Sequence, residues 1–427
     1  MSRLERLQDW VVNAGRPVRV ALVGTGQMGR GLAAQVGRIP GMELAVAVDV
    51  DADRARAALA LAKRDRIETE AARAAAAVDD GIAVAITEAA QLSSLDVDVV
   101  VEATGVPEVG AEVVHRAILA GQHVVTLNVE ADVTAGLYLS SMARGAGVVY
   151  SIADGDEPVC GKELVDFARD MAFEVVCAGK GKNNPFIPDA DPSSCADEAA
   201  RKHMNAKMLA SFQDGSKTMI EMAALANATG LPPDVTGMHG PSGSVDDLRS
   251  LLIPSADGGL LSGSGRVDYA FGPAPGVFVI VTSDDAAVSE EMAYLSMGDG
   301  PYWALYRPYH LASIEAPRTV MSAVLDGRPA FAASGWTAEV VATAKRDLEP
   351  GTVLEGIGGI HMRGMTYRAE DARDLLPLGL AEGAVIDRTV RAGEAIPRDA
   401  AQIRPSVIAD LRDLQERMLH DAGATTT

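Results

Sequence analysis

One short run constrains this fold more than any other: the segment Val20–Gly29, VALVGTGQMG, closes an expected strand and opens an expected helix. In a strand-turn-helix setting, the G-x-G-x-x-G pattern forms a dinucleotide-binding turn. Gly24 would allow the tight turn, Gly26 would let backbone amides approach a pyrophosphate, and Gly29 would permit close helix packing. The alternative is a structural glycine turn in an unrelated βα unit. The expected cofactor contacts are Gly24, Thr25, Gly26, Gln27, Met28 and Gly29.

Asp49 ends the second expected strand, 20 residues beyond the last glycine of the motif. An acid at this position binds the adenosine ribose hydroxyls. Asp51 and Asp53 add negative charge that disfavours a ribose 2′-phosphate, which points to NAD(H). Arg54 and Arg56 are close enough in sequence to reverse this preference if one folds over the ribose, so NADP(H) stays open.

Short β-rich runs alternate with helical stretches from Val18 to about Tyr150, which is typical of a parallel sheet with helical crossovers. We therefore expect residues 1–150 to form a doubly wound, Rossmann-type α/β domain that binds NAD(P), with residues 1–15 as a leading helix. The expected strands are VRVALVG, MELAVAVDV, VAVAI, DVVVEAT, HVVTLN and GVVYS.

Two further parts are expected after this domain. Residues 151–335 read as a helix-rich α+β catalytic domain that binds substrate, with a strong strand candidate at 276–282 and a loop over 240–265. From Trp336 onward, short β-like runs broken by glycine and proline predict a small all-β module over residues 336–420.

Composition argues against several classes of partner. A formal charge of −21 disfavours nucleic acid and anionic membranes, because most of the surface would repel phosphate. Three cysteines without a C-x-x-C pair predict neither disulfides nor a thiolate zinc site. The N-terminus lacks signal-peptide features and no run reaches about 18 apolar residues, so a cytoplasmic protein is expected. The tail DAGATTT is expected to fray.

Seven segments that occur in order resemble one family; they are VALVGTGQMG, VVEATGVPEVGA, HVVTLNVEADVTAG, GDEPV, SFQDGSKTMIEMA, FGPAPGVFV and YLSMGDGPYWALYRPYHL. This family is the group of homoserine-dehydrogenase-like oxidoreductases with a C-terminal SAF (β-clip) domain. It includes the DXR-like enzymes, which reduce and isomerise 1-deoxy-D-xylulose 5-phosphate for isoprenoid biosynthesis. The resemblance spans about Arg19 to Asp399, and TAKRDLEPGTVLEGIGG looks like part of the SAF module.

The resemblance implies an NAD(P)H-dependent oxidoreductase acting on a small, phosphorylated carbonyl compound. It implies NADPH as the cofactor, whereas Asp49 alone favours NADH. The reaction it supports best is reductive isomerisation of 1-deoxy-D-xylulose 5-phosphate to 2-C-methyl-D-erythritol 4-phosphate. Two alternatives stay open: reduction of aspartate semialdehyde, as in homoserine dehydrogenase, and a non-catalytic NAD-binding sensor. A homo-oligomer is expected because closed symmetry is common among soluble enzymes.

Further cofactor-side candidates follow two later strands. In similar dehydrogenases the loop after the fourth strand covers the nicotinamide, which here selects Thr104 and Gly105. Asn128 and Glu130 follow the next strand, at the edge where ligands bind in open α/β sheets. We expect Asn128 to orient the nicotinamide amide or the substrate, and Glu130 to bind substrate. The alternative for Asn128 is a cap on the helix that follows.

Two charged runs are candidates for the substrate site. The lysines of Gly-Lys180-Gly-Lys182, the most basic glycine-bearing run of this acidic chain, are expected to polarise a ketone, hold an enediolate or bind phosphate. The alternative is a solvated turn. Asp154, Asp156 and Glu157 are plausible ligands for a divalent cation, but they also fit a turn and a helix N-terminus, so no metal is assigned.

The segment 197–230 reads as one helix whose charged face carries Asp214 and Lys217. We expect Lys217 to donate to a carbonyl oxygen and Asp214 to orient it, the alternative being a solvated face. His239 lies in a loop of small residues, and the Arg307 guanidinium suits a phosphate. Both are expected to bind substrate.

Overall fold

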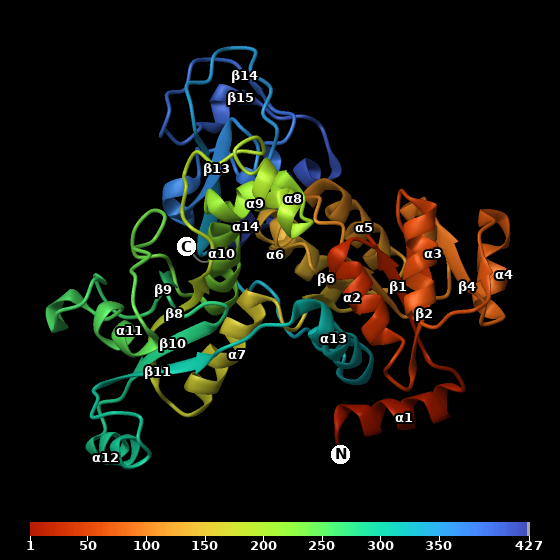
Figure 1. Cartoon of the computed structure of the whole chain (residues 1–427), viewed down its shortest axis with the longest axis horizontal. Helices are drawn as coiled ribbons and strands as arrows, with labels where there is room; N and C mark the ends of the chain where they lie inside the picture. The colour runs from red at the N-terminus through yellow and green to blue at the C-terminus, as the bar shows by residue number, and fades with distance from the viewer. Residues whose placement is uncertain (425–427) are drawn as a thin grey trace. The chain divides into compact units, whose positions relative to one another are not determined.

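The computed structural model describes residues 1–424 and divides the chain into two units, each built from distant segments (Figure 1). The first unit contains residues 1–156, 311–332 and those from 406 onward, and the second contains residues 157–310 and 333–405. The three-part division expected from the sequence stays a prediction. Of the tail expected to fray, residues 425–427 lie outside the described residues.

The first unit is built on a seven-stranded parallel sheet of order β3-β4-β2-β1-β5-β6-β7. Because the chain proceeds outward from β1 on both sides, the fold has the switch point of a doubly wound sheet. The strands are β1 (Val18–Val23), β2 (Met42–Val48), β3 (Ile67–Glu68), β4 (Ala83–Ile86), β5 (Val99–Glu102), β6 (His123–Thr126) and β7 (Tyr150–Ile152). The expected Rossmann-type α/β fold is confirmed, and short β3 is the additional strand.

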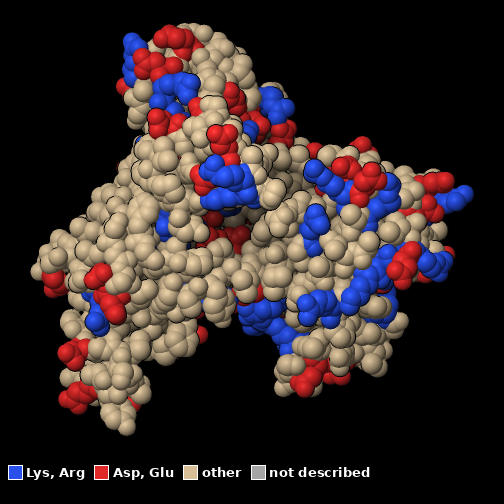
Figure 2. Space-filling view, in the orientation of Figure 1, with Lys and Arg blue, Asp and Glu red and all other residues tan. Residues whose placement is uncertain are grey.

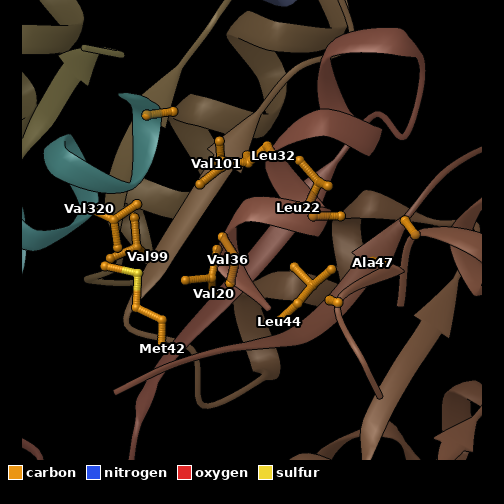
Figure 3. Packing of buried hydrophobic residues seen from close by; sticks show 14 of the residues in the cluster. Val20, Leu22, Leu32, Val36, Met42, Leu44, Ala47, Val99, Val101 and Val320 are labelled. Carbon is orange, nitrogen blue, oxygen red and sulfur yellow. The ribbon is translucent and has the colours of Figure 1, made fainter. Parts of the chain in front are cut away.

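Eight α-helices accompany this sheet in the described part of the first unit: α1 (Arg3–Ala14), α2 (Gln27–Val36), α3 (Ala52–Leu61), α4 (Ala74–Asp79), α5 (Pro107–Leu119), α6 (Val129–Ala146), α13 (Ala312–Asp326) and α14 (Val407–Ala424). The leading helix is present as α1, which starts at a capping box between Ser2 and Glu5 and buries Leu7. Figure 3 shows how helix and sheet residues meet in the core: Val20, Leu22, Val99, Val101, Leu32, Val36 and Val320.

The second unit contains a mixed four-stranded sheet of order β11-β10-β8-β9, in which β8 runs parallel to β9 and antiparallel to β10. Its strands are β8 (Glu174–Lys182), β9 (Arg266–Phe271), β10 (Val277–Thr282) and β11 (Tyr302–Arg307). The strand expected at 276–282 is β10. The helices of this part are α7 (Glu157–Asp170), α8 (Ala196–Lys202), α9 (Ala206–Gln213), α10 (Ser216–Thr229), α11 (Val245–Leu251) and α12 (Ala286–Tyr294).

Two predictions for the second unit were wrong. The segment 240–265, expected to be a loop, contains α11, which begins at a capping box between Ser244 and Asp247 and buries Leu248. The segment 197–230, expected to be one helix, forms α8, α9 and α10. The break before α10 is caused by Gly215, whose φ of +90° lies in the left-handed region that an α-helix does not use.

Residues 337–402 form two short antiparallel pairs, β12 (Ala338–Ala344) with β13 (Met362–Arg368) and β14 (Val385–Ile386) with β15 (Ala401–Gln402). No α-helix interrupts this fully described stretch, but residues 407–420 of the expected all-β module lie in α14, which belongs to the first unit. The assignment to the SAF type stays a prediction. These strands belong to the second unit together with residues 157–310.

Basic and acidic side chains are interspersed over the face drawn in Figure 2. Among residues 1–424, no helix combines the length and the apolar character that crossing a bilayer requires.

Candidate functional site

The glycine loop of the first unit lies between β1 and α2, and its glycines have distinct roles. Gly24 has a φ of +89°, and a Cβ there would come within 2.7 Å of the backbone of Ala103. A Cβ on Gly29 would lie 2.1 Å from the Gly24 carbonyl oxygen. Both positions therefore require glycine for the fold itself.

Gly26 differs, because a Cβ there would meet no protein atom within 4 Å. It is the N-cap of α2 and has no side-chain cap, so the first amides of this helix are available to an anion. A glycine that the protein does not need for packing, placed at an uncapped helix start, fits the close approach of a pyrophosphate. The loop therefore fits a dinucleotide.

Asp49 connects the end of β2 to this loop. Its carboxylate accepts hydrogen bonds from the amide (2.8 Å) and hydroxyl (2.7 Å) of Thr25, and from the amide of Asp51 (3.0 Å). Burial alone would raise the pKa of Asp49, but these hydrogen bonds outweigh it and hold the pKa below its usual value. Asp49 is thus an ionised acceptor beside the glycine loop. Arg54 forms an ion pair with Asp51, and Arg56 with Asp53.

The loop after β5 is held by buried Glu102, which accepts hydrogen bonds from the Thr104 amide (2.7 Å), the Thr104 hydroxyl and the Thr126 hydroxyl (3.0 Å). Burial raises the pKa of Glu102 although these hydrogen bonds oppose it. Gly105 follows in a left-handed conformation with a φ of +68°. Asn128 caps α6 by accepting from the Ala131 amide at 3.1 Å, which is the alternative considered from the sequence.

The second unit contains a cavity of about 190 Å³, which we call the lysine cavity. Its wall comes from the end of β8, the first turns of α7 and α10, and neighbouring segments. The charged and titratable side chains in the wall are Glu157, Lys180, Lys182, Lys217, Glu221 and His310, and Asn183, Asn184, Phe212 and Thr218 complete it. Three of the four predicted catalytic residues, the lysines, therefore lie around one cavity.

Alternation along β8 explains the sequence Gly-Lys-Gly-Lys. A Cβ on Gly179 would lie 2.0 Å from the carbonyl oxygen of Asp268, and one on Gly181 would lie 2.4 Å from the backbone of Pro273. Neighbouring backbone therefore packs against this face of β8 and excludes side chains. Lys180 and Lys182 point to the opposite face, since successive side chains of a strand alternate.

Lys180 is held between two carboxylates. Its ammonium lies 2.7 Å from Glu157 Oε1 and also contacts Glu221. Burial opposes the charge on Lys180, but the two carboxylates outweigh it and raise its pKa. Burial would likewise raise the pKa of Glu157, yet the charges of Lys180 and His310 lower it, whereas burial and the charge of Glu157 raise the pKa of Glu221. Lys180 and Glu157 thus form a charged pair.

Lys182 has a different environment. Burial and then the charge of Lys180 lower its pKa to about 8. Its Nζ donates to the carbonyl oxygen of Phe212 at 2.5 Å. Lys217 extends from the first turn of α10 and lies 3.9 Å from Glu221 Oε1. The lowered pKa of Lys182 suits this residue to proton transfer near neutral pH.

The remaining predicted residues have partners elsewhere. Asp214 is fully buried and forms an ion pair with Lys345 at 2.8 Å, and it does not line the lysine cavity. His239 Nε2 lies 2.9 Å from Asp234 Oδ2, and Arg307 pairs with Glu163 at 2.9 Å. Glu130 lies in the first turn of α6. Substrate contacts of His239, Arg307 and Glu130 stay predictions.

The carboxylates considered as cation ligands have separate contacts. Asp154 accepts a hydrogen bond from the Thr319 hydroxyl at 3.0 Å, whereas Glu157 binds Lys180. Sequence reasoning did not connect Glu157 or His310 with the lysines. It placed Glu221 on the helix face of Lys217, because Glu221 lies four residues after Lys217. Lys180 and Lys182 share one face of a strand.

Two family profiles match the chain in succession. Residues 24–151 match the profile described as "Homoserine dehydrogenase, NAD binding domain", which contains the glycine loop and Asp49. Residues 155–316 match "Oxidoreductase DRL, catalytic domain", which contains every residue that lines the lysine cavity. Both profile descriptions are those of oxidoreductases, and the first is that of an NAD-binding domain. The chain thus matches an NAD-binding domain of the homoserine dehydrogenase type, so that part of the expected resemblance is confirmed.

Solved dehydrogenase structures align with this chain at TM-scores too low to support any conclusion about function. The WlbA dehydrogenase from Bordetella pertussis is 16% identical, with a TM-score of 0.30, over 43% of this chain and 47% of that one. A probable dehydrogenase from Thermotoga maritima is 16% identical, with a TM-score of 0.41, over 73% and 90%. The chain thus spans about half of the length of the Bordetella protein. A search of the curated proteins found no match.

Proposed function

We propose that this oxidoreductase reduces a small carbonyl compound that carries an anionic group, and that the lysine cavity binds this substrate. The observation that carries the proposal is the convergence of Lys180, Lys182 and Lys217 on one cavity of a chain whose formal charge is −21. Three ammonium groups against the carboxylates of Glu157 and Glu221 give the wall an excess of positive charge when all are ionised. An anionic substrate is attracted to such a wall.

Lys182 is the proposed proton donor. With a pKa of about 8 it is mostly protonated at neutral pH, yet it releases its proton more readily than an ordinary lysine. When bound, a reduced nicotinamide would supply a hydride to the carbonyl carbon. Lys182 would transfer its proton to the carbonyl oxygen, so that the C=O bond becomes an alcohol and the lysine becomes a neutral amine.

Lys217 and Thr218 are the proposed anion-binding residues. Both lie in the first turn of α10, where the helix dipole favours negative charge, and Asp214 already accepts the Ser216 amide at this helix start. Lys180 stays charged and remains paired with the carboxylates of Glu157 and Glu221. Asp214, which was expected to orient Lys217, acts at a distance from the substrate in this proposal.

Among anionic carbonyl compounds, 1-deoxy-D-xylulose 5-phosphate is our first candidate, with 2-C-methyl-D-erythritol 4-phosphate as product. Rearrangement of its carbon skeleton passes through enolate-like charge, which lysines stabilise. Aspartate semialdehyde is the second candidate, favoured by the homoserine dehydrogenase type of the NAD-binding domain.

We also propose that the cofactor contacts come from the glycine loop, Asp49, Thr104, Gly105 and Asn128. The protein is proposed to be a homo-oligomer and to be cytoplasmic.

A cofactor-coupled assay tests this proposal. The purified enzyme is mixed with NADH or NADPH and, in separate reactions, with each of the two candidate substrates and a panel of uncharged ketones and aldehydes. Oxidation of the cofactor with an anionic substrate, and little with uncharged analogues of similar size, is the expected result. Turnover of aspartate semialdehyde but not of deoxyxylulose phosphate would contradict the first candidate. Cofactor binding without any turnover would favour a sensor.

A further inference from the structure

A fully buried ion pair connects the C-terminal β segment of the second unit to the start of α10. Lys345, the residue after β12, places its Nζ 2.8 Å from Asp214 Oδ2, and both side chains have an exposed fraction of 0%. The same ammonium donates to the carbonyl oxygens of Ala190 (2.5 Å) and Gly359 (2.8 Å). The ammonium therefore makes two hydrogen bonds to backbone carbonyls, and the carboxylate of Asp214 balances its buried charge.

The other oxygen of Asp214 holds the turn from which α10 begins. Asp214 Oδ1 accepts the amide of Ser216 at 2.8 Å. The Ser216 hydroxyl in turn accepts the amide of Gly364, in β13, at 2.7 Å. Gly215, between these two residues, is in the left-handed conformation, so the direction in which the helix leaves the turn depends on this short segment.

Further contacts from the C-terminal segment follow the same helix. The Thr366 hydroxyl donates to the carbonyl oxygen of Met219 at 2.9 Å. The amides of Thr337 and Ala338 both donate to Asn227 Oδ1, at 2.8 and 2.9 Å. The helix is therefore held near both ends by residues that follow Ala333. Its first turns carry Lys217, Thr218 and Glu221 into the wall of the lysine cavity.

We propose that Lys345 is a positioning residue of the lysine cavity: through Asp214 it fixes the turn at residues 214–216 and thereby the placement of Lys217 and Glu221. This inference rests on the proposed function, because it assigns the reaction to that cavity. It gives the C-terminal β segment a role in catalysis without substrate contact. Asp214 connects Lys345 to this turn and is likewise a positioning residue.

The test compares Lys345→Met with the matched control Lys207→Met in the full-length enzyme. Lys207 also donates to a carbonyl oxygen of the C-terminal segment, that of Glu355 at 2.5 Å, but it is half-exposed and lies on α9. Hydrogen–deuterium exchange of residues 214–221 is measured against β10 as an internal reference. Turnover with NAD(P)H and the affinity for NAD(P)H are measured on the same samples.

For Lys345→Met we expect exchange of residues 214–221 to rise by about tenfold, since an opened turn loses its protection. We expect kcat to fall by about tenfold or more, because misplaced catalytic groups lose rate steeply, while NAD(P)H affinity is unchanged. Lys207→Met should leave both the exchange and kcat unchanged. Unaltered exchange in Lys345→Met would overturn the proposal, and so would faster exchange with full kcat.

The exchange measurement needs no substrate, so it decides whether Lys345 holds the turn even if no tested carbonyl is reduced and the proposed function fails. If Lys345→Met does not fold, the same measurements are made on the double variant Lys345→Met with Asp214→Asn. This double variant removes both buried charges. We expect it to regain thermal stability but not kcat. Recovery of kcat together with stability would show a merely structural role and overturn the proposal.

Discussion

The ammonium of Lys180 and the carboxylate of Glu157 lie 2.7 Å apart, one at the end of β8 and the other in the first turn of α7. Glu221, on α10, contacts the same ammonium. Three elements of the second unit therefore meet at one buried charge. Because both carboxylates are withdrawn from water, Lys180 stabilises the wall of the cavity as well as contributing to its charge.

Lys180→Met should destabilise the enzyme strongly, because it removes the cation that lies nearest to two buried carboxylates. Removing one member of a buried ion pair costs roughly 3–5 kcal/mol. Lys162→Met is the control, since Lys162 pairs with the half-exposed Asp166 near the surface, and surface pairs contribute about 0–1 kcal/mol. Free energies of unfolding from urea titrations measure both. Equal losses in the two variants would contradict this view of Lys180.

The pH dependence of turnover tests the role of Lys182. A proton donor with a pKa lowered to about 8 is active when protonated, so kcat should be constant below that pH and fall as the pH rises through it. In Lys182→Arg the guanidinium stays protonated, so the variant should be slower but lose this alkaline fall. Rates measured from about pH 6 to 10 would refute the assignment if wild type and variant fall at the same pH.

Two glycine substitutions separate folding from cofactor binding. Gly26→Val places its side chain where the protein leaves open space, so the variant should fold and lose affinity for NADH and NADPH. Gly29→Ala forces a Cβ against the Gly24 carbonyl oxygen at 2.1 Å and should lower the melting temperature. Calorimetric titration and thermal melts measure the two effects. Unchanged cofactor affinity in folded Gly26→Val would mean that the loop does not bind the pyrophosphate.

Asp49→Ser should shift the preference toward NADPH, because it removes a negative charge and a ribose acceptor. The carboxylate also holds Thr25, so some affinity for both cofactors should be lost. Asp49→Asn is the control, since it removes the charge but keeps an acceptor for Thr25. The ratio of dissociation constants for NADH and NADPH measures the preference. If neither variant changes the ratio, the ribose binds elsewhere.

The sequence predicted the first unit well because its signals are local. Runs such as VRVALV and MELAVAV are β-branched and apolar, and both faces of their strands are buried. Gly29 follows from a contact within a few residues, because a Cβ there would meet the carbonyl oxygen of Gly24. Local patterns of this kind are visible without the fold.

The second unit was harder because its contacts join distant residues. Lys180 meets residues 157 and 221, and Asp214 meets Lys345, so no spacing rule connects them. The break before α10 was missed because the periodicity of the segment does not reveal the backbone conformation of Gly215. Its left-handed conformation shows that it ends a helical run.

The central claim, that carbonyl reduction takes place at the lysine cavity, is tested most directly by the turnover of the double variant Lys182→Met with Lys217→Met. The account predicts a fall in kcat/KM of about two orders of magnitude or more, because both the proton donor and an anion-binding charge are lost. The affinity for NAD(P)H, measured by titration on the same sample, should not change, because the glycine loop and Asp49 are intact. A variant that binds the cofactor and keeps wild-type kcat/KM would contradict the account.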